Sequence, residues 1–149
     1  MNDEYFMNQA IALAKEAAEE GEVPVGAVVV LDGKIVGAGR NRREISKNAL
    51  AHAEIEAINE ACRALGGWRL WQCDMYVTLE PCPMCTGAII NSRMKRLVYG
   101  ASDYKAGSCG SIVDLFSLPY NHKPEVVSGV MQEECAALLT DFFKKLRKK

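Results

Sequence analysis

Apolar residues recur at helical spacing at both ends of the chain. Near the start, Phe6, Ala10, Leu13 and Ala17 lie on one side of the helical wheel, and this predicts a first helix that ends at Gly21. The longest apolar stripe belongs to the last helix and should pack against the rest of the protein. It consists of Cys135, Leu138, Leu139, Phe142, Phe143 and Leu146.

Between these helices, strand patterns alternate with helical ones. Residues 23–31 are almost entirely apolar and predict a strand that is buried on both faces. Asp32-Gly33 is a strong hairpin signal, so residues 34–41 are expected to return as the antiparallel partner, followed by a polar loop. The pattern then predicts, in order, a helix, a strand, a helix, a strand, a loop with a short helix near residues 112–116, and a strand. These span residues 51–65, 74–80, 83–94, 96–101, 102–119 and 125–129.

This order predicts an α/β protein. Alternating strands and helices form a sheet between two helical layers, here a mixed five-stranded sheet in a three-layer α/β/α architecture. The length of 149 residues suits a single domain, residues 1–149. Ligands of such sheets bind beyond the carboxyl ends of strands, near helix starts. His52 and Cys82 each open a helix, so both are expected at that edge.

The composition narrows the class of protein. Hydrophobic residues make up 49% and charged residues 25%, as in a globular protein. No apolar run reaches the roughly 20 residues that cross a bilayer, and the acidic N-terminus does not resemble a signal peptide. We therefore expect a cytoplasmic protein with no membrane association.

The net charge of −1 argues against a protein that is basic all over. Three segments are nevertheless locally basic: residues 40–47, residues 93–96 and the tail at 144–149. Together they would form a patch for a phosphate backbone, while ordinary solvated surface is the simpler interpretation.

The sequence E-P-C-P-M-C at residues 80–85 contains the most specific chemistry. Six cysteines suit a disulfide framework only in a secreted chain, so Cys82 and Cys85 are better interpreted as metal ligands or as a redox pair. With Pro81 in the first turn of the helix, they would share one face there, where the helix dipole favours thiolates. Metal ligands from another part of the chain would favour a metal site over a redox pair.

A-H-A-E at residues 51–54 supplies such a ligand. His52 offers a nitrogen ligand, and Glu54 can point into the same pocket as a carboxylate that does not bind the metal. Cys73 should lie at the far end of the sheet, while a role for His122 stays open. Three protein ligands without a fourth are typical of a catalytic zinc site, in which the metal lowers the pKa of bound water to about 7. Structural zinc and a redox dithiol are the alternatives.

The pair of motifs, H-x-E followed by P-C-x-x-C, is typical of zinc nucleobase deaminases. The chain closely resembles the bacterial tRNA-specific adenosine deaminases, of the cytidine deaminase-like superfamily, almost from end to end. The matching stretches are G-E-V-P-V-G-A-V at 21–28, G-R-N at 39–41, A-H-A-E-I at 51–55, W-R-L at 68–70, Y-V-T-L-E-P-C-P-M-C at 76–85, G-A-S-D-Y-K-A-G at 100–107, N-H at 121–122 and E-C-A-A-L-L-T-D-F-F at 134–143.

The resemblance implies a homodimer that converts the wobble adenosine of a tRNA anticodon to inosine. It implies one zinc ion per subunit, held by His52, Cys82 and Cys85, with Glu54 as the catalytic proton shuttle. Residues expected to meet the substrate are Val25, Asn41, Ala53, Asp103, Lys105 and Asn121. Closing a turn is the alternative role for Asn41, while Glu80 and Trp68 are interpreted as structural.

Three rival functions stay open. A deaminase for a free base, guanine or cytosine, would have the same zinc motif but no need of basic segments. An RNA-binding zinc module would lack turnover. A redox protein would contain no zinc and would form a reversible disulfide between Cys82 and Cys85.

Overall fold

The computed structural model describes residues 2–148. The helices are α1 (Asp3–Glu19), α2 (Arg43–Ser46), α3 (Ala53–Leu65), α4 (Pro83–Asn91) and α5 (Gln132–Arg147), with a single 3-10 turn at Leu115–Ser117. The strands are β1 (Gly26–Leu31), β2 (Lys34–Arg40), β3 (Asp74–Leu79), β4 (Arg96–Ala101) and β5 (Glu125–Ser128).

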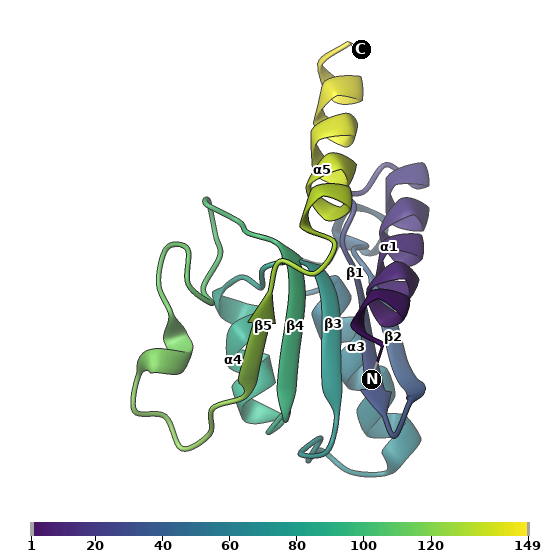
Figure 1. Cartoon of the computed structure of the whole chain (residues 1–149). Coiled ribbons are helices and arrows are strands. Elements are labelled where there is room, and N and C mark those ends of the chain that lie inside the picture. Colours follow the sequence, from purple (N-terminus) through teal and green to yellow (C-terminus); the bar gives the residue numbers. More distant parts are fainter. Residues whose placement is uncertain (1, 149) are drawn as a thin grey trace.

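The sheet is mixed and five-stranded, as the sequence predicts. Its strand order is β2-β1-β3-β4-β5. The hairpin β1–β2 and the pair β1–β3 are antiparallel, whereas β3–β4 and β4–β5 are parallel. As a result, the carboxyl ends of β3 and β4 lie at the same edge as the start of β1 and the end of β2 (Figure 1).

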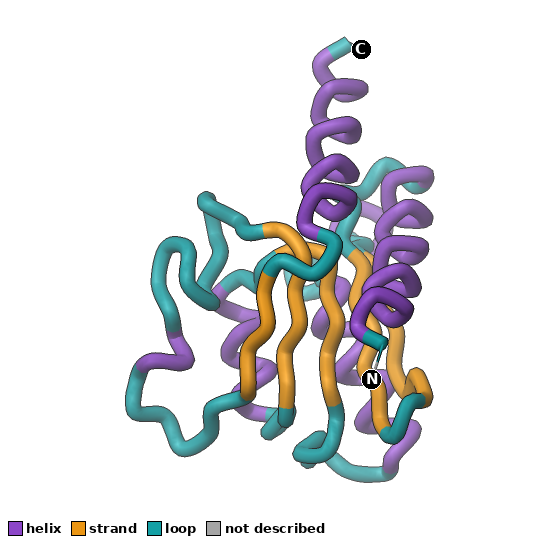
Figure 2. Tube along the Cα trace, in the orientation of Figure 1, coloured by secondary structure: helices purple, strands orange, loops and turns teal. Residues whose placement is uncertain are grey.

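Helices cover both faces of this sheet, which confirms the three-layer architecture (Figure 2). Helices α1 and α5 pack on one face over a cluster that includes Phe6, Met7 and Tyr76. Helices α3 and α4 pack on the other face over a second cluster that includes Met75 and Leu97. Strand β1 is buried along nearly its whole length because it contributes side chains to both clusters.

Two glycines fix α3 against β2. A Cβ atom at Gly37 would lie 2.2 Å from the carbonyl oxygen of Ala57, and one at Gly39 would lie 2.3 Å from that of Ala53. Any larger residue at either position would push the helix away from the sheet. Since His52 immediately precedes α3, this close approach also fixes the position of the imidazole.

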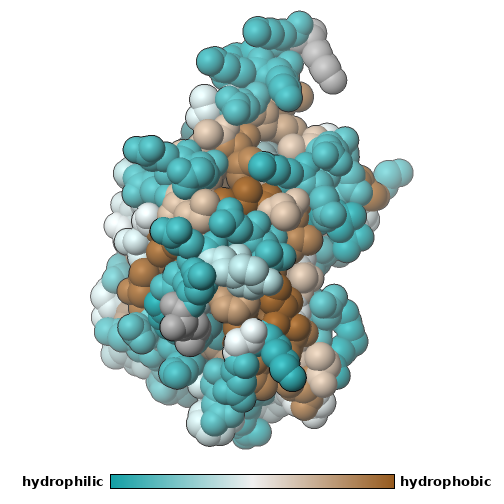
Figure 3. Space-filling model, turned by 45° about the vertical axis from the view of Figure 1, so that its right-hand side comes forward, coloured by the Kyte–Doolittle hydropathy of each residue, from teal (hydrophilic) through white to brown (hydrophobic). Residues whose placement is uncertain are grey.

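Three details differ from the sequence prediction. The loop after β2 contains the short helix α2. Pro83, not Pro81, is the proline in the first turn of α4, because the helix begins one residue after Cys82. The apolar stripe of α5 packs only over its first half, and Phe143 and Leu146 remain 41% and 51% exposed where the helix projects beyond the sheet. Figure 3 shows the mostly hydrophilic end of this helix with apolar side chains exposed beneath it.

An ion pair joins α1 to the sheet. Asp3 accepts hydrogen bonds from both Nη atoms of Arg96, at 2.9 and 2.7 Å, and one from the Tyr76 hydroxyl at 2.6 Å. The hydrogen bond from Arg96 is the main reason why the pKa of Asp3 lies below its ordinary value of 3.8. The carboxylate therefore stabilises the fold above pH 3.8, and this contribution is lost as the pH falls through the lower, folded pKa.

We expect Asp3→Asn to lower the free energy of unfolding by about 2 kcal/mol at pH 7, because a charge-assisted pair is lost. Denaturant unfolding at pH 7 and at pH 3 measures the difference, which should shrink at pH 3. Glu4→Gln, which changes an exposed neighbour on the same turn, is the control. An equal loss for Asp3→Asn at both pH values would contradict this account of the ion pair.

Within the described residues, none of the helices has the length and apolar character required to span a membrane.

Candidate metal centre and substrate cavity

Three metal-ligating side chains meet at the sheet edge where ligands were predicted to bind. The Nδ1 atom of His52 lies 3.7 Å from Cys82 Sγ and 3.6 Å from Cys85 Sγ. All three donor atoms lie within 4.8 Å of one another, and in residues 2–148 no other Cys, His, Asp or Glu joins them. Cys73 is not part of this cluster, as the sequence predicts.

Two helix starts build the cluster. His52 is the N-cap residue of α3 and Cys82 is that of α4, and both have extended backbone. Cys85 lies three residues further along, inside the first turn of α4, and is fully buried. Because the Pro83 ring lacks an N–H, it suits the first turn of α4, between the two cysteines.

The pKa values of the three side chains are shifted in different directions. The hydrogen bond from the Cys85 thiol, helped by His52, lowers the pKa of Cys82 to about 4. The same hydrogen bond, with burial, raises the pKa of Cys85 far above its ordinary value. His52 has a raised pKa, chiefly because of its hydrogen bond with Cys82. The lowered pKa of Cys82 favours its thiolate, the form in which sulfur binds a metal.

Glu54 lies beside the cluster without joining it. Its side chain is 4% exposed, and burial raises the pKa of its carboxyl group to about 7. A carboxyl group with such a pKa can hold or release a proton near neutral pH, which is what a general acid and base requires.

The three donors fit a zinc ion. With Zn–S near 2.3 Å and Zn–N near 2.0 Å, tetrahedral zinc separates nitrogen from sulfur by about 3.5 Å. The observed separations of 3.6 and 3.7 Å match this value. Two thiolates and one imidazole are also a ligand set that zinc takes in catalytic sites.

A cavity opens above the cluster. Its lining includes His52, Glu54 and Cys82 on one side. Four of the residues expected to meet the substrate also line it, namely Val25, Asn41, Ala53 and Asp103. The remaining lining residues are Val23, Arg43, Leu79, Glu80 and Ala106.

Comparison with known proteins identifies the family. The family model for MafB19-like deaminases matches residues 1–147. The tRNA-specific adenosine deaminase of Bacillus subtilis (strain 168) is 51% identical over 148 residues, which cover 99% of this chain and 92% of that protein. The chain belongs to the tRNA-specific adenosine deaminase family.

Solved structures agree with this assignment. A structure from a study of A-to-I editing by tRNA:A34 deaminases at the wobble position has a TM-score of 0.88 and 48% identity, covering 91% of this deaminase and 99% of that chain. A guanine deaminase from Bacillus subtilis is less similar, with a TM-score of 0.68 and 35% identity, covering 100% of this chain and 96% of that one.

Asn41 and Asp103 are held in the cavity wall of the deaminase by hydrogen bonds to the backbone. The Asn41 amide nitrogen donates to the Val23 carbonyl at 3.2 Å, and its Oδ1 accepts from the Arg43 amide at 3.4 Å, so this side chain does close a turn. An amide nitrogen carries two hydrogens, so one remains for a ligand. Asp103 Oδ1 accepts from the backbone amides of Lys105 and Ala106, at 2.9 and 3.3 Å, and neither bond uses Oδ2.

Two other predicted residues do not line the cavity. Lys105 is exposed on the loop that follows Asp103. Asn121 is also exposed, and its neighbour His122 pairs with the Met94 carbonyl at 2.6 Å, just before the start of β4. Within a single chain, Asn121 therefore lies near the start of β4, at the opposite end of the sheet from the cavity.

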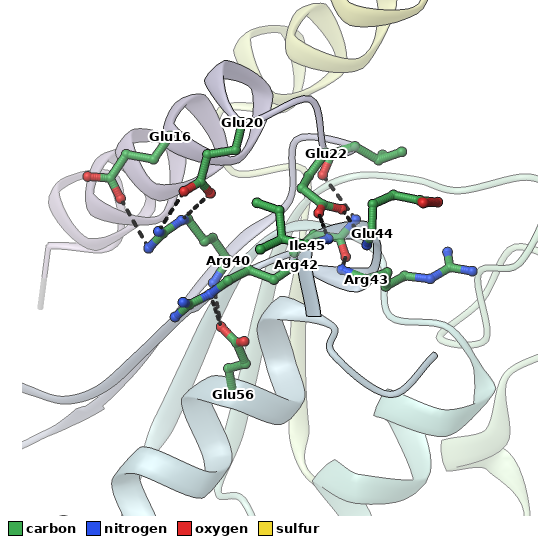
Figure 4. A network of polar contacts seen from close by, with 11 residues as sticks. Glu16, Glu20, Glu22, Arg40, Arg42, Arg43, Glu44, Ile45 and Glu56 are labelled. Carbon is green, nitrogen blue, oxygen red and sulfur yellow. Dashed lines mark hydrogen bonds and ion pairs between the residues drawn. The ribbon is translucent and has the colours of Figure 1, made fainter. Parts of the chain in front are cut away.

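The basic segments do not converge into one patch. Arg96 pairs with Asp3, while Arg40 pairs with Glu20 at 2.8 Å and Arg42 with Glu56 at 3.3 Å. Figure 4 shows Arg43 extending away from these pairs. A shallow hollow connects Arg43 to Phe142, Phe143 and Leu146 of α5, so the 40–47 segment does adjoin the basic C-terminal helix. Lys149, the last residue of the predicted basic tail, lies outside the described residues.

Two buried carboxylates lie near the cavity, and sequence reasoning missed Glu22 but predicted a structural role for Glu80. Glu22, 1% exposed, accepts from the backbone amides of Glu44 and Ile45 at 3.1 and 2.7 Å and so holds α2 in place (Figure 4). Glu80, 2% exposed, binds the loop at 103–111, and its structural role was predicted without its partners. The hydrogen bonds from the Glu44 amide to Glu22 and from the Asp103 amide to Glu80 each join residues more than 20 positions apart, and no local sequence pattern reveals such contacts.

Proposed function

We propose that this deaminase converts the wobble adenosine of a tRNA anticodon to inosine, with water as the co-substrate and ammonia as the second product. The observation that carries the proposal is the cluster of His52, Cys82 and Cys85 at the base of a cavity with buried Glu54 beside it. The 51% identity to a tRNA-specific adenosine deaminase over nearly the full chain favours the RNA substrate over a free base.

The residues of the cavity have two roles, metal binding and proton transfer. His52, Cys82 and Cys85 would hold one zinc ion per subunit, which when bound would supply a water molecule acidic enough to act as a nucleophile at neutral pH. Glu54 would take a proton from the attacking water and deliver it to ring nitrogen 1 of adenine, while the water oxygen adds to carbon 6. Glu54 would then take the proton of the added hydroxyl group and pass it to the amino group, so that the bond from carbon 6 to the amino nitrogen breaks, ammonia leaves and the carbonyl of inosine forms.

The lining selects and orients the base. An adenosine must be unstacked from the anticodon loop to enter such a cavity. Val25 and Ala53 present buried apolar surface to the base. The second N–H of Asn41 and Oδ2 of Asp103 offer polar contacts to the base. Lys105 meets RNA outside the cavity. Asn121 meets RNA bound to a second subunit or the body of the tRNA.

We infer that the homodimer forms through the α3–α4 side. Trp68 is 49% exposed there, and Leu65 at the end of α3 is 40% exposed. Trp68 stacks under Arg69 and Arg93, with the guanidinium carbons 4.3 and 5.6 Å from the ring, and borders an apolar groove between the two helices. Trp68 thus packs less within the chain than the sequence suggested. Sedimentation equilibrium should give twice the mass of one chain.

Kinetics with two kinds of substrate test the function. We expect turnover of an anticodon stem-loop with adenosine at the wobble position and none of free guanine or cytosine. The similarity to a guanine deaminase makes the free base the competing substrate. Turnover of free guanine with none of the stem-loop would reverse the assignment.

The unpaired arginine at the cavity mouth gives a further prediction. Arg43 lines the cavity, and no ion pair to it is found in residues 2–148, whereas Arg40 is held by Glu20. We expect Arg43→Ala to raise KM for the stem-loop about fivefold, since one phosphate or base contact is lost. Arg40→Ala is the matched control and should leave KM unchanged. Equal effects of the two variants in steady-state kinetics would mean that general positive charge, rather than Arg43, attracts the RNA.

A further inference from the structure

We propose that Glu80 is a positioning residue for substrate binding, because its buried carboxylate holds the loop at 103–111 that brings Asp103 to the cavity. This inference rests on the proposed function, since the position of the loop matters to activity only if Asp103 meets the substrate.

Four donors from one loop converge on this carboxylate. Glu80 Oε1 accepts from the Asp103 amide at 3.0 Å and from the Ser111 hydroxyl at 2.5 Å. Oε2 accepts from the amides of Cys109 and Ser111, at 3.0 and 3.1 Å. The loop consists of turns and bends with one isolated bridge between Cys109 and Asp114. Backbone hydrogen bonds such as that from Ser108 to the Pro81 carbonyl also hold it, but Glu80 is the side chain that ties three of its amides to the end of β3.

The loop is packed tightly against the carboxylate. A Cβ atom at Gly107 would lie 2.4 Å from Glu80 Cδ and 2.4 Å from the Asp103 carbonyl oxygen. Gly107 itself donates to that carbonyl at 2.8 Å, which closes the turn that carries Asp103 and Ala106 into the lining. Only glycine allows the loop to approach so closely.

The position of Glu80 explains why a carboxylate is needed. It follows β3 directly and precedes the Pro81–Cys82 step into the metal centre, so it belongs to the rigid sheet edge. An ionised carboxylate accepts on both oxygens, and all four donors point at it. A glutamine has one oxygen and one NH₂ group, so two of the loop's donors would face another donor.

Two substitutions test the contact from its two sides. Glu80→Gln removes the acceptor, and Gly107→Ala pushes the loop away without altering the strand end or Cys82. We expect each to raise KM for the stem-loop about tenfold with kcat changed less than about threefold, as for a misplaced binding group. Ser111→Ala, which removes one donor and keeps the carboxylate, should change KM less than about twofold.

Hydrogen exchange and a double variant separate this role from general stability. Amides of residues 103–111 should exchange faster in both variants, while zinc content and exchange in α3 stay as in the wild type. If Glu80 acts through Asp103, Glu80→Gln combined with Asp103→Ala should have no higher KM than Asp103→Ala alone. Exchange measures the contact without any substrate, so it stays informative even if the proposed function fails. Unchanged exchange and unchanged KM in both variants would overturn the proposal, as would zinc loss with a normal KM.

Discussion

Glu54→Gln is expected to lower kcat on the stem-loop about 10³-fold while the protein keeps its zinc and its affinity for RNA. The glutamine side chain fills the same space but cannot transfer a proton, and positioned acid–base groups contribute about 10² to 10⁴ in rate. Burial of Glu54 without a place in the ligand cluster is the reason to expect a loss of rate rather than of metal. Single-turnover kinetics, zinc analysis and RNA titration measure the three quantities.

Glu60→Gln provides the matched control for that experiment. Glu60 lies on the same helix as Glu54 but is exposed, so the same chemical change should leave kcat unaltered. A Glu54→Gln variant that retained its turnover would remove this residue from the mechanism. A variant that lost zinc instead would make it a ligand.

Cys85→Ala is expected to abolish both metal binding and turnover. It removes one of three donors from a fully buried position, and we expect zinc affinity to fall at least about 100-fold. Zinc content after dialysis, measured by mass spectrometry of the metal, gives the first result, and stem-loop kinetics give the second.

Cys62→Ala is the control for this cysteine. Cys62 is half-buried on α3 and lies outside the cluster, so its replacement should leave the zinc content unchanged. If Cys85→Ala bound zinc as tightly as the wild type, the three-donor site would be wrong. If the wild-type protein contained no zinc and Cys82 and Cys85 formed a reversible disulfide, a redox function would replace the hydrolytic one.

The sequence was sufficient to predict the fold and the metal cluster because both depend on local signals. The apolar runs and the Asp32-Gly33 turn define the strands, and a residue that begins a helix after a strand must lie at one sheet edge. His52 and Cys82 meet for this reason, although 30 residues separate them. The choice of the helix-opening proline was wrong, since Pro83 and not Pro81 occupies that position.

What the sequence did not reveal depends on contacts between distant segments. The ion pairs that occupy Arg40, Arg42 and Arg96 could not be inferred from the basic character of those stretches. Nor does an apolar stripe say how far a helix extends past the sheet, which is why the exposure of Phe143 was unexpected. Gly37 and Gly39 lie in an ordinary strand pattern, and only the structure explains them by the approach of α3.

Mass spectrometry of the RNA product is the most direct measurement of the central claim. An anticodon stem-loop with a single adenosine at the wobble position, incubated with the zinc-loaded enzyme, should gain about one mass unit as the amino group becomes a carbonyl, and fragmentation should place the change at that nucleotide. An RNA of unchanged mass after prolonged incubation with protein that carries a full complement of zinc would contradict the account.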